Sequence, residues 1–207
     1  MRRRLRVCRR SLEPSVRASH SRAIARSLVE HPSFQKAATL ALYLAVDNEV
    51  DTGPLVEHAA AAGKRIYLPV VEGMSSPLTF VPFRVGDRLV RTRLGLWEPE
   101  SRSGSLRADE VVRLDLVCLP LVGFDRHGGR LGYGGGFYDR TLAVGRVVSE
   151  SSGGAARMPL LAGLAYAFQE VPDLPHEAHD VLLDLVVTEN ETFSPDGEES
   201  QSSLAGE

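Results

Sequence analysis

The sequence contains little cysteine, and its two cysteines, Cys8 and Cys118, lie far apart. No C-x-x-C pair is present, which argues against a zinc site or a dithiol redox centre. Cys118 falls inside an apolar run, where a thiol behaves as a small core residue. This use of cysteine is typical of a reducing compartment, so we expect a cytoplasmic protein.

Long apolar runs are also missing, because no stretch reaches the ~18–20 residues that a membrane-spanning helix needs. The first twelve residues are basic, but no apolar segment follows them, which argues against a secretory signal. A mitochondrial transit peptide remains an alternative for this Arg-rich start. The net charge of −3 gives no bias towards nucleic acid or anionic membranes. We therefore expect no nucleic-acid and no membrane partner. We also expect small-molecule partners and a monomeric protein.

The pattern of apolar runs predicts an α/β fold. Residues 2–30 are predicted to be helical, with a break near Pro14. A βαβ unit follows, made of a strand over 40–46, a helix capped by Asp51 or Thr52, and a strand over 65–69. Further strands are expected at 78–83, 114–120, 160–167 and 182–188, a helix at 137–144, and loops at 84–110 and 149–157. We expect one Rossmann-like three-layer domain over 1–189, a mostly parallel sheet with helices on both faces. A polar, disordered tail is expected over 190–207.

The segment from Arg130 to Arg140, RLGYGGGFYDR, is the most informative part of the chain. Its four clustered glycines, between an apolar strand and a helix, allow backbone N–H groups to approach an anion closely. It matches neither G-x-x-x-x-G-K-[ST] nor G-x-G-x-x-G, since Phe137 stands at the third glycine. A flexible glycine turn is therefore an open alternative. Asp139 favours a phosphate site, because a carboxylate there is well placed to hold Mg²⁺.

Residues 120–139, PLVGFDRHGGRLGYGGGFYD, resemble the nucleotide loop of the 5-formyltetrahydrofolate cyclo-ligase (methenyltetrahydrofolate synthetase) family. That pattern is approximately P-x-x-G-F-D-x-x-G-x-R-L-G-x-G-x-G-Y-Y-D, and the resemblance extends from Arg2 to about Glu189. It implies a ligase of one-carbon metabolism, which converts 5-formyltetrahydrofolate to 5,10-methenyltetrahydrofolate with Mg²⁺ and ATP and releases ADP and phosphate. A non-catalytic folate- or nucleotide-binding protein that retains the fold is the alternative. Phe137, where the family usually has tyrosine, is its best support.

The resemblance also implies an ATP site. Arg2 to Arg6, RRRLR, resembles the family's K-x-x-L-R, in which the lysine and the arginine contact ATP phosphates. The i, i+4 spacing places Arg2 and Arg6 on one helix face. A solvated basic helix end is the alternative. The implied ATP-binding residues are Arg2, Arg6, Arg130, Leu131, Gly132, Tyr133, Gly134, Gly135, Gly136, Phe137 and Tyr138.

For the folate, the resemblance places Glu49 against the substrate, in a setting similar to the family's E-V-x-T. A carboxylate can accept two hydrogen bonds from the N–H edge of a pterin. A helix-capping acidic cluster is the alternative. The implied substrate-binding residues are Leu44, Glu49, Trp97, Tyr133, Gly135 and Phe137.

The implied metal ligands are Asp139 and Asp184. Asp184 stands between apolar residues, where a buried carboxylate is costly unless it is paired or metal-bound. If it faces solvent instead, that role disappears. No protein nucleophile is expected.

Overall fold

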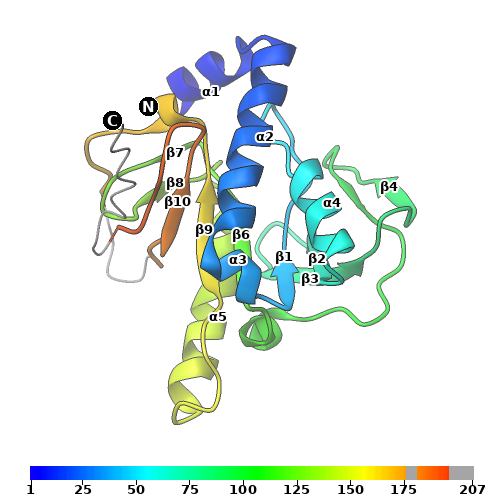
Figure 1. Cartoon of the computed structure of the whole chain (residues 1–207). Helices are drawn as coiled ribbons and strands as arrows, with labels where there is room; N and C mark the ends of the chain where they lie inside the picture. Colours follow the sequence, from blue (N-terminus) through cyan, green and yellow to red (C-terminus); the bar gives the residue numbers. More distant parts are fainter. Residues whose placement is uncertain (176–180, 196–207) are drawn as a thin grey trace, which may run out of the picture.

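The computed structural model describes residues 1–175 and 181–195. Within them, seven strands form one central sheet (Figure 1). The five middle strands are parallel, and the two edge strands are antiparallel to their neighbours. In spatial order the strands are β11 (Thr192–Phe193), β10 (Leu185–Val187), β9 (Leu160–Leu164), β6 (Leu116–Pro120), β1 (Thr39–Ala41), β2 (Arg65–Val71) and β3 (Leu78–Phe83).

Helices cover both faces of this sheet, as predicted. One face carries α2 (Pro14–Glu30), α3 (Pro32–Lys36) and α4 (Gly53–Ala61), and the other carries α5 (Phe137–Ser151) (Figure 1). Alternate residues of a strand point to opposite faces, so β6 supplies both hydrophobic clusters. Leu116 and Cys118 enter the cluster under α2, and Val117 and Leu119 enter the cluster under α5. The three-layer α/β architecture is therefore confirmed.

The predicted helix break and the βαβ unit are both present. Helix α1 (Arg2–Arg10) ends before Pro14, which occupies the first turn of α2. Strand β1 is followed by α4 and then by β2, which pairs with β1 in parallel. Thr52 is the N-cap residue of α4, but its hydroxyl donates to the Tyr43 carbonyl, and the Asp51 carboxylate accepts from the Gly53 N–H at 2.9 Å instead.

Several predicted boundaries were wrong. Strand β1 stops at Ala41, whereas α5 continues to Ser151 into the expected loop at 149–157. The expected loop at 84–110 contains the hairpin of β4 (Leu89–Arg91) and β5 (Trp97–Pro99) and the start of a 3₁₀ helix, η1 (Ala108–Arg113). A second hairpin, β7 (Gly123–Phe124) and β8 (Arg130–Leu131), separates β6 from the glycine loop. Strand β9 is followed by a 3₁₀ turn, η2 (Ala167–Gln169).

The first residues of the predicted tail over 190–207 include a β-strand. Strand β11 pairs with β10, because Thr192 and Phe193 stand opposite Val187 and Val186. The remaining part of that expectation, residues 196–207, lies outside the described residues. Within the described part of the chain, no helix combines the length and apolarity needed to cross a membrane.

The topology brings two loops to the same edge of the sheet. Residues 42–52 follow the carboxyl end of β1, and the β7–β8 hairpin with the glycine loop follows the carboxyl end of its parallel neighbour β6. Ligands of open α/β sheets bind beyond this edge. The candidate site is therefore expected there.

Helix α5 packs closely on η1 at Gly145. A Cβ atom at Gly145 would lie 2.2 Å from Cγ1 of Val111, far inside contact distance. Gly145→Ala is therefore expected to lower the free energy of unfolding by about 1–3 kcal/mol, although alanine is the better helix former. Thermal unfolding measures this, with Val147→Ala at an exposed position of the same helix as control. An unchanged or higher Tm of Gly145→Ala would contradict this packing.

Candidate active site

The glycine loop connects β8 to the N-terminus of α5. Gly134 has φ 97° and Gly136, the N-cap residue, has φ 61°, so both occupy the left-handed region that favours glycine. Gly132 has no such conformation, and a Cβ there would meet no atom within 4 Å. The fold itself therefore does not require glycine at position 132. A ligand that approaches the backbone closely would explain it.

The two arginines predicted from the N-terminal motif both contact this loop. Arg2 Nε donates to the carbonyl oxygen of Gly132 at 2.9 Å. The Arg6 guanidinium carbon lies 4.9 Å from the centroid of the Tyr133 ring, and its Nε donates to Asp47 at 2.8 Å. The side chain of Arg6 remains 36% exposed. Two cations therefore stand beside the loop, where a bound phosphate would need them.

Asp139 lies in the first turn of α5 and forms an ion pair with Arg130. The Arg130 side chain is only 9% exposed, whereas 46% of the Asp139 side chain is accessible. The helix dipole favours a carboxylate at this end of the helix. Mg²⁺ at nucleotide sites often uses one or two carboxylates together with phosphate oxygens. A single accessible carboxylate beside the glycine loop fits that arrangement, and no cluster of three acidic, histidine or cysteine ligands occurs among residues 1–175 and 181–195.

Asp184 does not lie at this edge of the sheet. It precedes β10, where its carboxylate accepts from the Leu161 N–H at 2.7 Å, as Asp115 does from the Thr39 N–H before β6. Its side chain is exposed, so the premise that a buried carboxylate there needs a metal was wrong. We therefore leave Asp184 out of the metal site.

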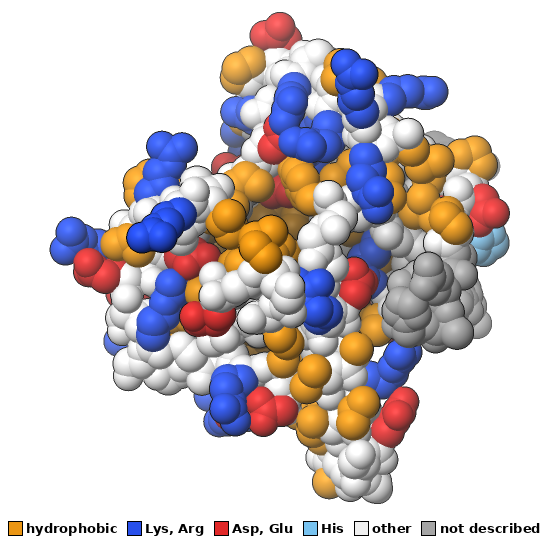
Figure 2. Space-filling view, turned by 180° about the vertical axis from the view of Figure 1, so that it is seen from behind, with side chains coloured by type: hydrophobic (Ala, Val, Ile, Leu, Met, Phe, Trp, Pro, Cys, Tyr) orange, Lys and Arg blue, Asp and Glu red, His pale blue; other side chains and the backbone are white. Residues whose placement is uncertain are grey.

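Three of the predicted substrate residues line one pocket. This pocket has a volume of about 630 Å³, within the range of small-molecule sites. Figure 2 shows the molecule from behind, with a hollow near the centre bordered by apolar side chains and by Lys and Arg side chains. The pocket is lined by Arg17, Leu44, Ala45, Asp47, Asn48, Glu49, Asp51, Leu89 and Trp97. Leu44 and Glu49 come from the loop after β1. Trp97 comes from β5, which is distant in sequence but lines the same cavity.

Glu49 is a buried carboxylate, with 4% of its surface exposed. Burial raises its pKa to about 7. Three neighbours favour the ionised form and partly offset this effect: Arg9, Tyr133 and the Val46 N–H, which donates to Oε2 at 3.0 Å. The carboxyl group therefore changes charge near neutral pH. A ligand that donates N–H groups to it would favour the ionised form.

The sequence reasoning missed two residues, Arg9 and Asp47. Asp47 accepts hydrogen bonds from Arg6, Arg9 and Arg10. Although burial opposes ionisation, these guanidinium groups lower the pKa of Asp47 to about 2. Asp47 and Asn48 both have positive φ, 51° and 59°, which is uncommon for residues other than glycine. The Arg-rich helix and the D-N-E segment can be recognised in the sequence. No local spacing pattern, however, predicts a contact between Arg9 and Asp47, which are 38 positions apart.

The aromatic residues after the glycines, Phe137 and Tyr138, are partly buried against the core. The rings of Phe137 and Tyr138 pack against the hydrophobic cluster under α5, and the Leu131 side chain packs against Leu5, Val122, Val171 and Leu174. Burial raises the pKa of Tyr138 well above its usual range. Contacts from Phe137 and Tyr138 to a nucleotide therefore remain predictions.

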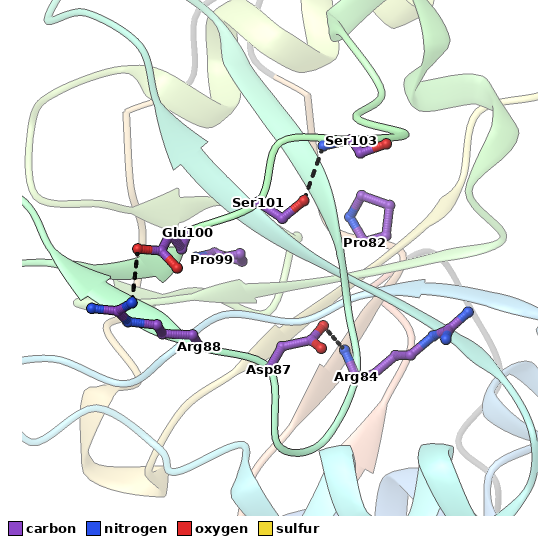
Figure 3. Close-up of a pocket in the computed structure, with 8 residues that line it drawn as sticks. All are labelled: Pro82, Arg84, Asp87, Arg88, Pro99, Glu100, Ser101 and Ser103. Atoms are coloured by element: carbon purple, nitrogen blue, oxygen red, sulfur yellow. Dashed lines mark hydrogen bonds and ion pairs between the residues drawn. The ribbon is translucent and has the colours of Figure 1, made fainter.

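A second pocket, of about 330 Å³, lies between the end of β3 and β5 (Figure 3). Arg88 and Glu100 form an ion pair across it at 3.4 Å, and Asp87 accepts from the Arg84 N–H at 2.8 Å. None of the predicted site residues lines this pocket. Of these two pockets, the one that contains Glu49 is therefore the one lined by predicted site residues.

Comparison with known proteins gives a consistent result. Residues 1–189 match the model of the 5-formyltetrahydrofolate cyclo-ligase family. The chain is 37% identical over 193 residues to the 5-formyltetrahydrofolate cyclo-ligase of Escherichia coli K12, covering 91% of this chain and 98% of that protein. The solved structure of Aquifex aeolicus 5,10-methenyltetrahydrofolate synthetase superposes with a TM-score of 0.76 at 28% identity, covering 99% of this chain and 95% of that one. A Mycoplasma pneumoniae 5,10-methenyltetrahydrofolate synthetase, at 24% identity and a TM-score of 0.68, shares the fold over 91% of this chain and 96% of its own. The chain belongs to the 5-formyltetrahydrofolate cyclo-ligase family and is a ligase.

Proposed function

We propose that this enzyme uses ATP and Mg²⁺ to convert 5-formyltetrahydrofolate to 5,10-methenyltetrahydrofolate, releasing ADP and phosphate. The observation that supports this best is the connection between the glycine loop and the Glu49 pocket. Tyr133 comes from the loop, and its hydroxyl donates to the Asp47 carboxylate, which lines the pocket, at 3.3 Å. A nucleotide on the loop and a folate in the pocket would therefore be neighbours.

The chemistry explains why two adjacent subsites are needed. The formyl oxygen is amide-like and is a poor leaving group. Transfer of the γ-phosphoryl group to this oxygen breaks the bond between the β- and γ-phosphates and releases ADP. The neighbouring folate nitrogen then attacks the formyl carbon and loses its proton to solvent, and the C–O bond breaks to release phosphate. The enzyme contributes mainly alignment and charge neutralisation.

Each group has a defined part in this proposal. Glu49 would accept hydrogen bonds from the pterin N–H edge, and Leu44 and Trp97 would contact its apolar surface. The glycine-loop amides, Arg2 and Arg6 would bind the phosphates. Asp139 would hold Mg²⁺, which when bound neutralises nucleotide charge, and Arg130 would orient the Asp139 carboxylate.

An absorbance assay tests the proposal. Protein incubated with 5-formyltetrahydrofolate and Mg-ATP is expected to produce the methenyl chromophore, with one ADP for each product molecule. Omitting ATP should abolish the signal. Binding of both compounds without a chromophore would favour the alternative of a non-catalytic binding protein.

Gly132→Ala separates ligand binding from folding. Because a Cβ at position 132 meets nothing in the protein, we expect no loss of Tm. The methyl group would obstruct a nucleotide close to the backbone, so the KM for ATP is expected to rise by roughly tenfold, equivalent to about 1.4 kcal/mol. Steady-state kinetics with varied ATP measure this.

Gly63→Ala is the matched control with the opposite expected outcome. Gly63 has φ 68° and lies after α4, so alanine there is strained by about 1 kcal/mol. Its Tm should fall while its KM for ATP stays unchanged. Equal ATP kinetics in Gly132→Ala and the parent protein would exclude close nucleotide contact at position 132.

A further inference from the structure

Arg9 is a charged residue that the fold buries almost completely, with 1% of its surface exposed. Its Nε donates to the Asp47 carbonyl at 2.9 Å, and its Nη1 donates to the Leu121 carbonyl at 3.0 Å. Its Nη2 donates to the Asp47 carboxylate at 3.1 Å and to the Tyr133 hydroxyl. One side chain of α1 thus holds the loop after β1, the segment after β6 and the glycine loop.

The Tyr133 hydroxyl is oriented by these contacts. Because Arg9 carries only donors, the hydroxyl oxygen accepts from Arg9, and its own proton faces two carboxylates, that of Asp47 at 3.3 Å and that of Glu49. The Tyr133 ring also lies below two guanidinium groups, 4.9 Å from Arg6 and 5.4 Å from Arg9.

The glycine loop has little other packing near Tyr133. A Cβ at Gly132 or at Gly134 would meet no atom within 4 Å, so no neighbouring group packs on the Cβ side of either glycine. Arg2 binds the Gly132 carbonyl, but its own side chain is exposed. Tyr133 therefore links this part of the loop to the buried Arg9, through both its hydroxyl and its ring.

We propose that Arg9 and Asp47 are positioning residues that hold the glycine loop, through the Tyr133 hydroxyl, at a fixed distance from the pocket that contains Glu49. Burying a guanidinium and a carboxylate carries a desolvation cost that their attraction only partly offsets, so their net stabilisation is small. Holding the glycine loop in place would explain why the chain keeps the Arg9–Asp47 pair despite this small stabilisation. This inference rests on the proposed function, in which the loop and the pocket hold the two reactants.

The test combines a dynamic and a kinetic measurement on three variants. Tyr133→Phe removes one hydroxyl from a side chain that is 41% exposed, so the fold is expected to persist. Arg9→Met removes the buried guanidinium group and keeps a side chain of similar length. Arg3→Met removes the same charge from an exposed position of the same helix and is the control. Amide ¹⁵N relaxation of glycine-labelled protein without ligands reports the order of the loop.

In Tyr133→Phe and Arg9→Met we expect the order parameters of Gly132 and Gly134 to fall towards about 0.6, with no change in Arg3→Met. Loss of alignment should lower kcat by roughly 10- to 100-fold with little change in the KM for the folate. The double variant should be no worse than the more severe single variant, because both changes remove one anchor. Arg9→Lys should restore only part of kcat, because it keeps the charge and loses the fork.

The outcomes separate this inference from the proposed function. Unchanged glycine order in Tyr133→Phe would overturn the inference even if the parent enzyme turns over. Additive losses of kcat in the double variant would also overturn it, since they indicate separate roles. Loss of glycine order without turnover in the parent protein would support the anchor and overturn the proposed reaction instead. If Arg9→Met does not fold, Tyr133→Phe and Asp47→Asn still decide the matter by the same two measurements.

Discussion

Replacing Asp139 with asparagine is expected to lower kcat by roughly 100- to 1000-fold, the usual cost of removing a group that stabilises charge in the transition state. The neutral amide binds Mg²⁺ poorly, so the Mg²⁺ concentration for half-maximal activity should rise as well. The fold should persist, because the Asp139 side chain is 46% exposed. Steady-state kinetics over a range of Mg²⁺ concentrations, with thermal unfolding alongside, measure both effects.

The control for this variant is Asp109→Asn. Asp109 is an exposed acidic residue of η1 paired with Arg107 at 3.6 Å, and it lies outside the proposed site. It should retain the parent kinetics. Near-full turnover of Asp139→Asn at saturating Mg²⁺ would remove Asp139 from the metal site.

Glu49→Gln is expected to stabilise the ligand-free protein at alkaline pH. The pKa of Glu49 is about 7 in the folded state, above its ordinary value of 4.5, so the folded state binds more protons than the unfolded state between these values. The free energy of unfolding therefore falls as pH rises through this window, by about 3 kcal/mol in total. Glutamine does not titrate, so its Tm should exceed that of the parent protein at pH 8 and converge with it near pH 5. Identical pH profiles of Tm would contradict the buried titration.

The same variant is expected to lose folate affinity. An ionised carboxylate accepts two N–H hydrogen bonds, whereas the glutamine amide presents one acceptor and one donor. The loss of a charge-assisted bond costs about 1.5–3 kcal/mol, or roughly a 10- to 150-fold increase in Kd. Calorimetric titration with 5-formyltetrahydrofolate at pH 8 measures this in the absence of turnover. Unchanged affinity would show that Glu49 does not contact the pterin.

The parts of the fold that follow from local pattern were predictable. Pro14 separates two helices because proline lacks an N–H and suits a first helical turn. The apolar run at residues 116–120 predicted a buried strand, and the glycine cluster predicted a loop before a helix. These signals depend on residues that are neighbours in the sequence.

The remaining features depend on contacts that no local pattern encodes. The β4–β5 hairpin carries Trp97 to the pocket across more than forty residues, and its strands are three residues each. The buried Arg9 and the partly buried Asp47 form a pair only after α1 folds over the carboxyl edge of the sheet. Asp184 was misjudged because apolar neighbours in sequence do not determine whether a residue at the start of a strand is buried.

In the proposed reaction, the glycine loop and the Glu49 pocket align the γ-phosphate with the formyl oxygen. The most direct test is to supply 5-formyltetrahydrofolate labelled with ¹⁸O in the formyl group and to analyse the released phosphate by mass spectrometry. We predict one ¹⁸O atom in each phosphate, formed together with one methenyl product. Unlabelled phosphate, with the ¹⁸O released in water, would contradict phosphoryl transfer to the formyl oxygen.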